Sequence, residues 1–298
     1  MTEGLEQRLA AMLMRETHPA VAAQACILGQ EAGALAVLFY GSNSRSRSLE
    51  GVLDYYVLTP GAPEKGLWPR VAYREWDYAG TTLRAKIATV TLAKFAAAAA
   101  GRTLDTTIWA RFVQPSVLVW QRDEAAGSAA ASAIADAART AARLAVALGP
   151  PEGHPDDFWR ALFSATYRAE FRVEPPGRAD AILGANREHF SGLLPAALGS
   201  AGVVYAEDGT TIRPTMTPAA RRRVLRWWRI RRRLGKALNI ARLMRAARTF
   251  DGAARYAAWK IERHTGLALE VTPWREKHPL LAAPGVLWRV WRRRKIGS

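Results

Sequence analysis

The sequence predicts an α+β fold, in which a mixed sheet with helices is followed by a mostly helical part and a basic amphipathic C-terminal region. Short apolar, β-prone runs alternate with turn residues in the first part of the chain. Residues 128–148 form a long alanine-rich run without Gly or Pro, which favours a helix. With 298 residues, 49% of them hydrophobic and 23% charged, the chain has the balance of a globular protein.

Four segments are predicted to be strands, because they are short, apolar and bounded by polar or turn residues. They span residues 34–39, 52–58, 83–90 and 115–120. Residues 203–212 are predicted to form a hairpin, since Asp208-Gly209 between two apolar runs is typical of a tight turn. The order of the strands within the sheet does not follow from the sequence.

Helices are predicted where residues of helical composition follow a suitable start signal. They span residues 2–28, 91–101, 128–148, 156–172 and 179–189, and residues 106–112 are either helical or extended. Thr217 suits the N-cap, and Pro218 the first position, of a further long and basic helix. Gly149-Pro150-Pro151 ends the alanine-rich helix and is the clearest break in the chain.

Composition excludes several classes of protein. The chain has one cysteine, Cys26, which excludes a disulfide framework and a cysteine-based zinc site. No run reaches the ~18 uninterrupted apolar residues that a membrane-spanning helix needs. The N-terminal residues have charges interspersed, which indicates an amphipathic helix rather than a secretory signal. We therefore expect a cytoplasmic protein that is soluble or attached peripherally to the inner face of the membrane.

The net charge of +17 is concentrated at one end of the chain. Residues 219–298 hold 22 Lys and Arg against 4 Asp and Glu, whereas residues 1–218 hold 21 against 22. The same C-terminal part holds 6 of the 11 tryptophans. Such a localised charge favours a polyanionic partner, either an anionic membrane or nucleic acid.

The long basic helix carries an apolar stripe surrounded by arginines, which a membrane interface favours. The stripe consists of Trp227, Ile230, Leu234, Leu238, Ala241 and Met244. Each basic residue near an anionic surface contributes about 1 kcal/mol, and Trp favours the headgroup level. We therefore expect Trp227, Trp228, Trp288 and Trp291 to contact a membrane. The alternatives are a helix packed on the protein with a solvated basic face and, less favoured, nucleic-acid binding.

The chain is thus expected to contain a catalytic domain at residues 1–125, a mostly helical domain at 126–218 and a membrane-docking region at 219–298. The first of these contains an apolar strand that runs into Gly41-Ser42, with Asp54 in the next strand. This outline is typical of a nucleotidyltransferase. The glycine lets the backbone approach a triphosphate, and an aspartate suits a divalent metal. The candidate nucleotide-binding residues are Gly41, Ser42, Asn43, Ser44 and Arg45.

The same pattern also fits an ordinary turn between two buried strands. The usual second carboxylate, two residues after the first, is replaced by Tyr56. A two-metal mechanism needs more than one carboxylate, so another acid has to come from elsewhere in the chain.

Further segments, taken in order with Gly41-Ser42 and Asp54, resemble the mitochondrial translocator-maintenance family of phosphatidate cytidylyltransferases, also called CDP-diacylglycerol synthases. They span residues 84–87, 109–117, 166–173 and 249–260. The resemblance extends over roughly residues 39–260. It implies a nucleotidyltransferase-like sheet, a Mg²⁺ cofactor, CTP and a lipid phosphate as substrates, and work at an anionic membrane surface.

The resemblance also implies roles for individual residues. Asp54 and Glu170 match the family's carboxylates and would hold the metal, although the family has Asp where this chain has Glu170. Lys86 and Arg111 match basic positions that suit phosphate charge. The positions that match a lipid-contacting role are Arg172, Arg255, Tyr256 and Lys260.

Structural roles are the alternatives for the same side chains. Lys86 and Lys260 fit solvated positions equally well. Arg111 fits an ion pair with Asp105 or Asp123, and Glu170 fits a bridge to a neighbour on its own helix.

The reaction that the resemblance implies is CTP plus phosphatidate giving CDP-diacylglycerol plus pyrophosphate, in phospholipid biosynthesis. Three alternatives stay open. One is a nucleotidyltransferase acting on another lipid phosphate, such as a phosphorylated sphingolipid or isoprenoid. A second is an RNA-directed nucleotidyltransferase, and a third is a non-catalytic membrane-binding protein with this fold. The oligomeric state does not follow from the sequence.

Overall fold

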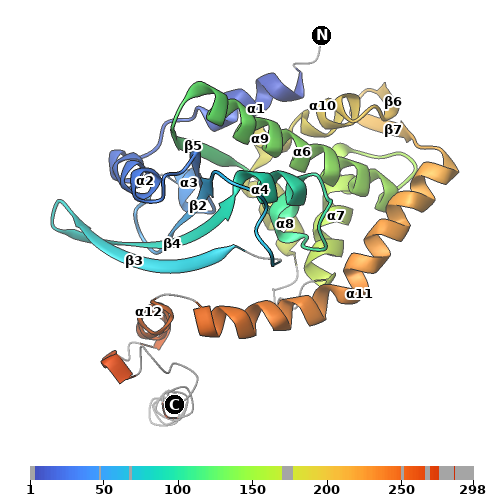
Figure 1. Ribbon diagram of the computed structural model, residues 1–298. Helices are drawn as coiled ribbons and strands as arrows, with labels where there is room; N and C mark the ends of the chain where they lie inside the picture. The colour runs from blue at the N-terminus through green and yellow to red at the C-terminus, as the bar shows by residue number, and fades with distance from the viewer. Residues whose placement is uncertain are drawn as a thin grey trace.

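The protein is described here from a computed structural model. The structure describes residues 4–46, 48–66, 69–169, 177–249, 252–265, 269–274 and 285. A central sheet lies between helix α2 on one side and a larger group of helices on the other, and the long helix α11 runs along the outside (Figure 1). This arrangement confirms the predicted α+β class with a mixed sheet.

The main sheet has five strands in the order β3-β4-β2-β1-β5. They are β1 (Ala36–Tyr40), β2 (Leu53–Thr59), β3 (Arg70–Tyr78), β4 (Thr81–Thr91) and β5 (Ser116–Gln121). Strands β2 and β4 are parallel, and the other neighbouring pairs are antiparallel. The sheet is mixed because β3 and β4 form a hairpin, so that β4 returns alongside β2 in the same direction.

One face of the sheet packs against α2 (Pro19–Glu31). Because side chains alternate along a strand, Tyr55 and Val57 of β2 face α2 together with Val37 and Phe39 of β1. Every one of these side chains is apolar or aromatic and buried. This face therefore contributes packing.

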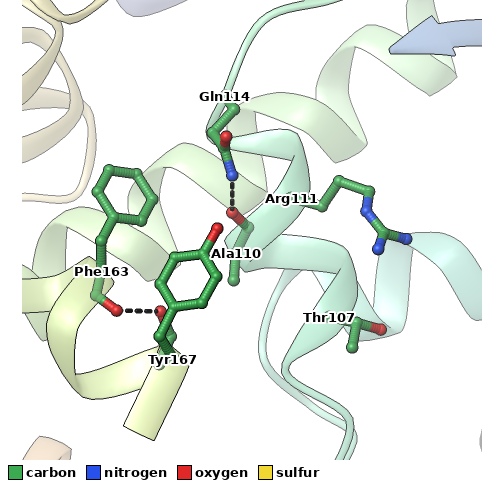
Figure 2. Close-up of a pocket in the computed structure, with 7 residues that line it drawn as sticks. Thr107, Ala110, Arg111, Gln114, Phe163 and Tyr167 are labelled. Carbon is green, nitrogen blue, oxygen red and sulfur yellow. Dashed lines mark hydrogen bonds between the residues drawn. The ribbon is translucent and has the colours of Figure 1, made fainter. Parts of the chain in front are cut away.

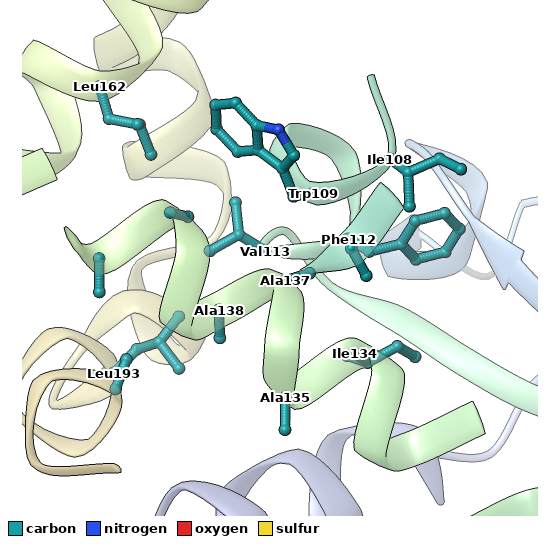
Figure 3. Packing of buried hydrophobic residues seen from close by; sticks show 14 of the residues in the cluster. Ile108, Trp109, Phe112, Val113, Ile134, Ala135, Ala137, Ala138, Leu162 and Leu193 are labelled. Carbon is teal, nitrogen blue, oxygen red and sulfur yellow. The ribbon is translucent and has the colours of Figure 1, made fainter. Parts of the chain in front are cut away.

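The other face is covered by α4 (Leu92–Ala99), α5 (Thr107–Phe112) and α6 (Glu124–Leu148). Alanines line the buried side of α6 and let its neighbours approach closely (Figure 3). The core continues into α1 (Leu5–Leu13), α7 (Pro155–Ala169), α8 (Arg178–Ala185), α9 (Arg187–Phe190) and α10 (Leu193–Ser200). One apolar core thus extends across residue 125, and the three expected domain boundaries stay predictions.

Three smaller elements complete the first part of the chain and its helical continuation. They are α3 (Asn43–Ser46), β6 (Val204–Asp208) and β7 (Thr211–Thr215). The last two form the predicted hairpin, with Gly209 at φ 59° in its turn. A positive φ at this position is the conformation that Asp-Gly turns require.

The C-terminal part begins with α11 (Pro218–Thr249), which is followed by α12 (Ala253–Thr265). Trp228 is only 3% exposed and packs on Trp109. The indole nitrogen of Trp227 donates to the carbonyl of Gly101 over 2.9 Å, and the Arg231 guanidinium lies 4.0 Å from the centre of the Trp227 ring. These contacts fix α11 to the rest of the protein.

The prediction for Trp228 as a membrane contact is therefore wrong, and that for Trp227 stays a prediction. Trp228 is in the protein core, and Trp227 is half-buried with its indole N–H bonded to the backbone. The apolar pattern of the helix was correct, but these aromatic side chains belong to its protein-facing side. Trp288 and Trp291, predicted to have the same role, lie outside the described residues.

Several local predictions also differ from the structure. Residues 2–28 were expected to form one helix, but α1 and α2 are separate because Pro19 begins a new helix, with His18 as its N-cap. Strand β3 was not predicted, and neither was α10. Within the described residues, no helix has both the length and the apolar character needed to cross a bilayer.

Candidate functional site

A row of aligned side chains crosses the five strands near the end of β1. Strand pairing places these residues directly opposite one another, so their side chains leave the same face of the sheet. From one edge of the sheet to the other, the row consists of Ser116, Tyr40, Asp54, Lys86 and Tyr73. Two residues predicted to be catalytic, Asp54 and Lys86, are thus neighbours on the two parallel strands.

Gly41 follows β1 and lies against the Asp54 carboxylate. Its φ is +93°, and a Cβ at this position would lie 3.2 Å from Oδ2 of Asp54. Glycine is therefore favoured both by the backbone conformation and by the short approach to the carboxylate. Gly41 and the Asp54 carboxylate therefore lie together, and their role as a nucleotide and metal site stays a prediction.

Asp54 is half-buried and surrounded by cationic and phenolic groups. Burial raises the pKa of the Asp54 carboxyl, while the charges of Lys86 and Arg111 and the Tyr40 hydroxyl lower it. That hydroxyl lies 3.5 Å from Oδ1. A carboxylate with this much desolvation and these charged neighbours is typical of functional sites as well as of structural ion-pair networks.

Arg111 brings helix α5 into the site. Its guanidinium lies 5.1 Å from the centre of the Tyr40 ring. Burial raises the pKa of the Tyr56 phenol, and the charge of Arg111 and its hydrogen bond to Tyr56 lower it. Asp123, an alternative partner of Arg111 in the sequence analysis, is the N-cap of α6 and accepts a hydrogen bond from Arg122.

Helix α12 closes another side of the site through Tyr256. The Tyr256 ring packs on Tyr73, with 5.4 Å between the ring centres. Burial and the charge of Asp54 raise the pKa of the Tyr256 phenol, so this side chain is within electrostatic reach of the carboxylate. Gly252 approaches β3 so closely that a Cβ would lie 2.6 Å from the Tyr73 carbonyl oxygen.

A second aromatic residue of α12, Trp259, strengthens this contact. Its ring lies 5.6 Å from the guanidinium of Arg84 on β4 and 5.4 Å from that of Arg263 on α12. Each such cation–π contact contributes about 0.5–1 kcal/mol at an exposed position. Arg255 and Lys260 of the same helix are exposed. Tyr256, also expected to contact lipid, packs against Tyr73 of the row.

The loop after Gly41 uses several of its side chains to fix its own shape. The Asn43 side-chain amide donates to the carbonyls of Ser48 and Glu50 over 3.0 and 2.7 Å. Ser44 Oγ donates to the carbonyl of Gly41 over 2.8 Å, and Ser42 Oγ donates to Asn43 Oδ1 over 3.1 Å. Asn43 and Ser44 therefore shape the turn, and Ser42 is the most exposed of the three. The side chain of Arg45 lies outside the described residues.

A shallow, open hollow lies between α5 and α7, and its space of about 330 Å³ includes open solvent. Figure 2 shows Tyr167 lying between Phe163 and α5, while Arg111 extends away from both aromatic rings. The hollow is lined by Thr107, Ala110, Arg111, Gln114, Phe163, Thr166 and Tyr167. The Gln114 amide donates to the Ala110 carbonyl over 3.1 Å. The lining thus combines polar and apolar side chains.

Glu170 and Arg172, predicted as a metal ligand and a lipid contact, lie outside the described residues. Among the residues that are described, no group of three or more His, Cys, Asp or Glu is arranged to hold a metal. Mg²⁺ is commonly held by one or two carboxylates together with substrate phosphates. Asp54 supplies one such carboxylate.

Sequence reasoning missed the aromatic part of the site. Tyr40, Tyr56 and Tyr73 surround the charged groups, and Trp259 supports α12. A signal was present for Tyr40, which directly precedes Gly41 in the motif. Tyr73 had no such signal, since its strand was not predicted.

Comparison with known proteins adds no identification. No protein-family model matches the chain, and no curated protein matches it either. The resemblance between short segments of this sequence and the cytidylyltransferase family therefore supports a proposal, and the argument for function depends on the geometry of the site.

Proposed function

We propose that this protein is a nucleotidyltransferase that transfers the cytidylyl group of CTP to phosphatidate, forming CDP-diacylglycerol and pyrophosphate. The observation that carries the proposal is the position of Asp54 beside Gly41, with Lys86 opposite it and Arg111 within electrostatic reach. The choice of CTP and phosphatidate comes from the sequence resemblance, as does the assignment of the sheet to the nucleotidyltransferase type.

In the proposed reaction, a phosphate oxygen of the lipid forms a bond to the α-phosphorus of CTP. The bond from that phosphorus to the oxygen bridging to the β-phosphate breaks, and pyrophosphate leaves with the electron pair. A phosphomonoester is already an anionic nucleophile at neutral pH, so no strong general base is required. The protein has to position two anionic groups and neutralise their charge.

Residues in and around the row divide this work. Asp54, with Glu170 as the proposed second ligand, would hold Mg²⁺, which neutralises triphosphate charge when bound. The backbone at Gly41-Ser42 lets the triphosphate come close. Lys86 and Arg111 stabilise the negative charge that develops on the transferring phosphorus and on the leaving pyrophosphate. Burial raises the pKa of Tyr256, which keeps its phenol protonated and able to donate to phosphate.

The surface of α11 supports work at a membrane. Its outward side exposes Ile230, Leu234 and Met244 by 48%, 39% and 58%. Exposed basic residues flank this apolar stripe, among them Arg226, Arg229 and Arg233. An exposed apolar stripe with basic flanks suits the interface of an anionic bilayer. We propose that this side of α11 attaches the protein peripherally to the cytoplasmic face of the membrane, where its lipid substrate lies.

A transferase for another lipid phosphate is the second candidate. Asp54, Lys86 and Arg111 all suit phosphate groups, and none of them distinguishes one lipid tail from another. A phosphorylated sphingolipid or isoprenoid would meet the same charged groups in the same positions.

The testing experiment measures pyrophosphate release from CTP, ATP, GTP and UTP with Mg²⁺, in the presence of vesicles that contain phosphatidate or another lipid phosphate. We expect release that requires both CTP and phosphatidate. Asp54→Asn should reduce the rate about a hundredfold or more. Asp208→Asn, in the exposed β6–β7 hairpin, is the matched control and should leave the rate unchanged.

The outcomes separate the candidates. Release that depends on a different lipid phosphate keeps the transferase and replaces the substrate. No release under any condition, or full activity of the Asp54→Asn protein, contradicts the proposed function and favours a non-catalytic membrane-binding protein.

A further inference from the structure

A second shallow, open hollow lies between α11 and the segment that leads into α5, and its space of about 300 Å³ includes open solvent. Thr107 lines this hollow as well as the one between α5 and α7, so the two lie on either side of the same helical turn. Arg111 follows Thr107 by one turn of α5. The second hollow is therefore adjacent to the proposed transfer site, although none of the residues assigned to that site lines it.

The hollow contains a cation with donors to spare. Arg242 is half-buried, and its hydrogen bond among the described residues runs from Nη2 to Asn239 Oδ1 over 2.8 Å. A guanidinium has five N–H donors. The second arginine there, Arg231, differs, since it donates to the carbonyls of Trp227, Gly101 and Thr103 and so fixes the backbone.

The acidic residue of the hollow is already engaged by its own turn. Asp105 is 5% exposed, and its carboxylate accepts hydrogen bonds from the Thr107 amide and from the Thr107 hydroxyl. With Arg231 and Arg242 both present, the charged side chains lining the hollow carry a net positive charge. An anion is therefore the ligand class that this lining favours.

Apolar side chains form the rest of the lining. Leu104 is 36% exposed, and Leu238 is half-buried. On α11, Leu238 lies one helical turn from Leu234 and from Ala241, both of which are exposed. The apolar wall of the hollow therefore continues onto the exposed apolar stripe of the helix.

Arg242 is also electrostatically close to the row on the sheet. Burial raises the pKa of the Tyr56 phenol, and Arg242 is one of the cations that lower it. Tyr56 lies two residues after Asp54 on β2, so both side chains leave the same face of the strand.

We propose that the hollow between α5 and α11 binds the phosphomonoester group of an amphiphile, with Arg242 on the phosphate and with Leu104 and Leu238 against the apolar tail. This deepens the proposed function and rests on it, because the bound molecule would be the lipid phosphate that attacks CTP. The tail leaves the hollow along the apolar stripe of α11, where it would enter the apolar interior of a membrane.

The test is direct binding of dioctanoyl phosphatidate to the full chain without nucleotide, measured by titration calorimetry. Glycerol 3-phosphate supplies the phosphate without a tail, and dioctanoylglycerol supplies the tail without a phosphate. We expect the wild type to bind dioctanoyl phosphatidate more tightly than either. Arg242→Gln should weaken that binding by about tenfold to a hundredfold, the usual cost of a lost charged hydrogen bond.

Two further variants serve as controls. Arg232→Gln removes an exposed charge of the same helix and should leave binding unchanged. Leu104→Asn should weaken the binding of dioctanoyl phosphatidate without affecting that of glycerol 3-phosphate. Because this variant keeps Arg242, it tests the proposal even if the Arg242→Gln protein does not fold. Far-UV circular dichroism checks the fold of each variant.

Three results overturn the proposal. One is no binding by the wild type, and another is equal affinity of the Arg242→Gln and Arg232→Gln proteins. The third is a loss of CTP–Mg²⁺ binding in Arg242→Gln with lipid binding intact, which would assign the hollow to the nucleotide. A different result contradicts the proposed reaction and leaves the binding proposal intact. It is a protein that binds dioctanoyl phosphatidate through Arg242 but releases no pyrophosphate from CTP.

Discussion

The two faces of the central sheet are made from the same strands but carry different kinds of side chain. The face toward α2 is apolar and aromatic in its interior, with Phe39 and Tyr55 in ring contact at 5.3 Å. The opposite face is equally apolar where α4 and α6 cover it, but near the end of β1 it carries Asp54 and Lys86. Near the end of β1, polar side chains on this second face therefore occupy positions that apolar core residues hold elsewhere.

This difference shows how the fold can hold charged groups at a half-buried position. Desolvation of a carboxylate is unfavourable unless partners compensate for it. Here the partners are Lys86 on the neighbouring strand, Arg111 on α5 and the phenol of Tyr40. The apolar face toward α2 supplies the packing that keeps these strands in register. Substitutions on the face toward α2 should consequently reduce stability, whereas those at Asp54 and Lys86 on the opposite face should reduce the reaction rate.

Phe39→Ala should produce the largest effect on stability. Phe39 is 1% exposed and lies in the cluster against α2. Truncating a buried Phe to Ala costs about 3–5 kcal/mol. Tyr40→Phe is the matched substitution on the other face. It keeps the ring contact with Phe112 and removes only a hydroxyl that lies 3.5 Å from Asp54, so a loss below about 1 kcal/mol is expected.

Urea unfolding of the two variants measures both free energies of unfolding. Similar losses for Phe39→Ala and Tyr40→Phe would contradict the difference between the faces.

The sequence predicted the parts of this site that depend on residues close together in the chain. Gly41, Ser42 and Asp54 could be identified because a turn and two adjacent strands bring them together. The alignment of Lys86 with Asp54 is different, since it requires the parallel pairing of β2 with β4. These two strands are neighbours in the sheet but are separated in the sequence by a further strand. That strand, β3, was missed because its charged residues, such as Arg74 and Glu75, interrupt the apolar pattern by which strands are recognised.

Helix α11 shows the same limit. Its periodicity revealed an apolar stripe, but periodicity does not show which side of a helix meets the protein. Trp109, more than a hundred residues earlier in the chain, packs on Trp227 and Trp228 and so determines the buried side. The stripe at Ile230, Leu234 and Met244 is left exposed.

Gly252→Ala should have an intermediate effect, concentrated on α12. The residue has φ +74°, and a Cβ would lie 2.6 Å from the Tyr73 carbonyl oxygen, so either the backbone or α12 has to move. Gly33→Ala is the matched control, because Gly33 also has a positive φ (+54°) but open space around its Cβ position. The control should lose about 1 kcal/mol from backbone strain alone.

Proteolysis of α12 and tyrosine fluorescence report on the contact between Tyr73 and Tyr256. An effect of Gly252→Ala no greater than that of Gly33→Ala would show that α12 does not depend on this close approach. A larger effect, accompanied by slower pyrophosphate release, would support α12 as a wall of the site.

The smallest expected effect is the pH dependence of stability that Asp54 contributes. Burial raises the pKa of this carboxyl in the folded protein above its ordinary value. The folded state then holds the proton more tightly than the unfolded state, so stability falls as the pH rises from the ordinary Asp pKa through the raised one. Asp54→Asn removes this dependence. The free energy of unfolding of the wild type should therefore fall relative to that of Asp54→Asn across that interval. At higher and lower pH, the difference between the two should stay constant. Urea unfolding at a series of pH values measures the difference. If the wild type instead gains stability relative to Asp54→Asn as the pH rises, the charges of Lys86 and Arg111 outweigh burial, and the pKa of the Asp54 carboxyl is lowered in the folded protein.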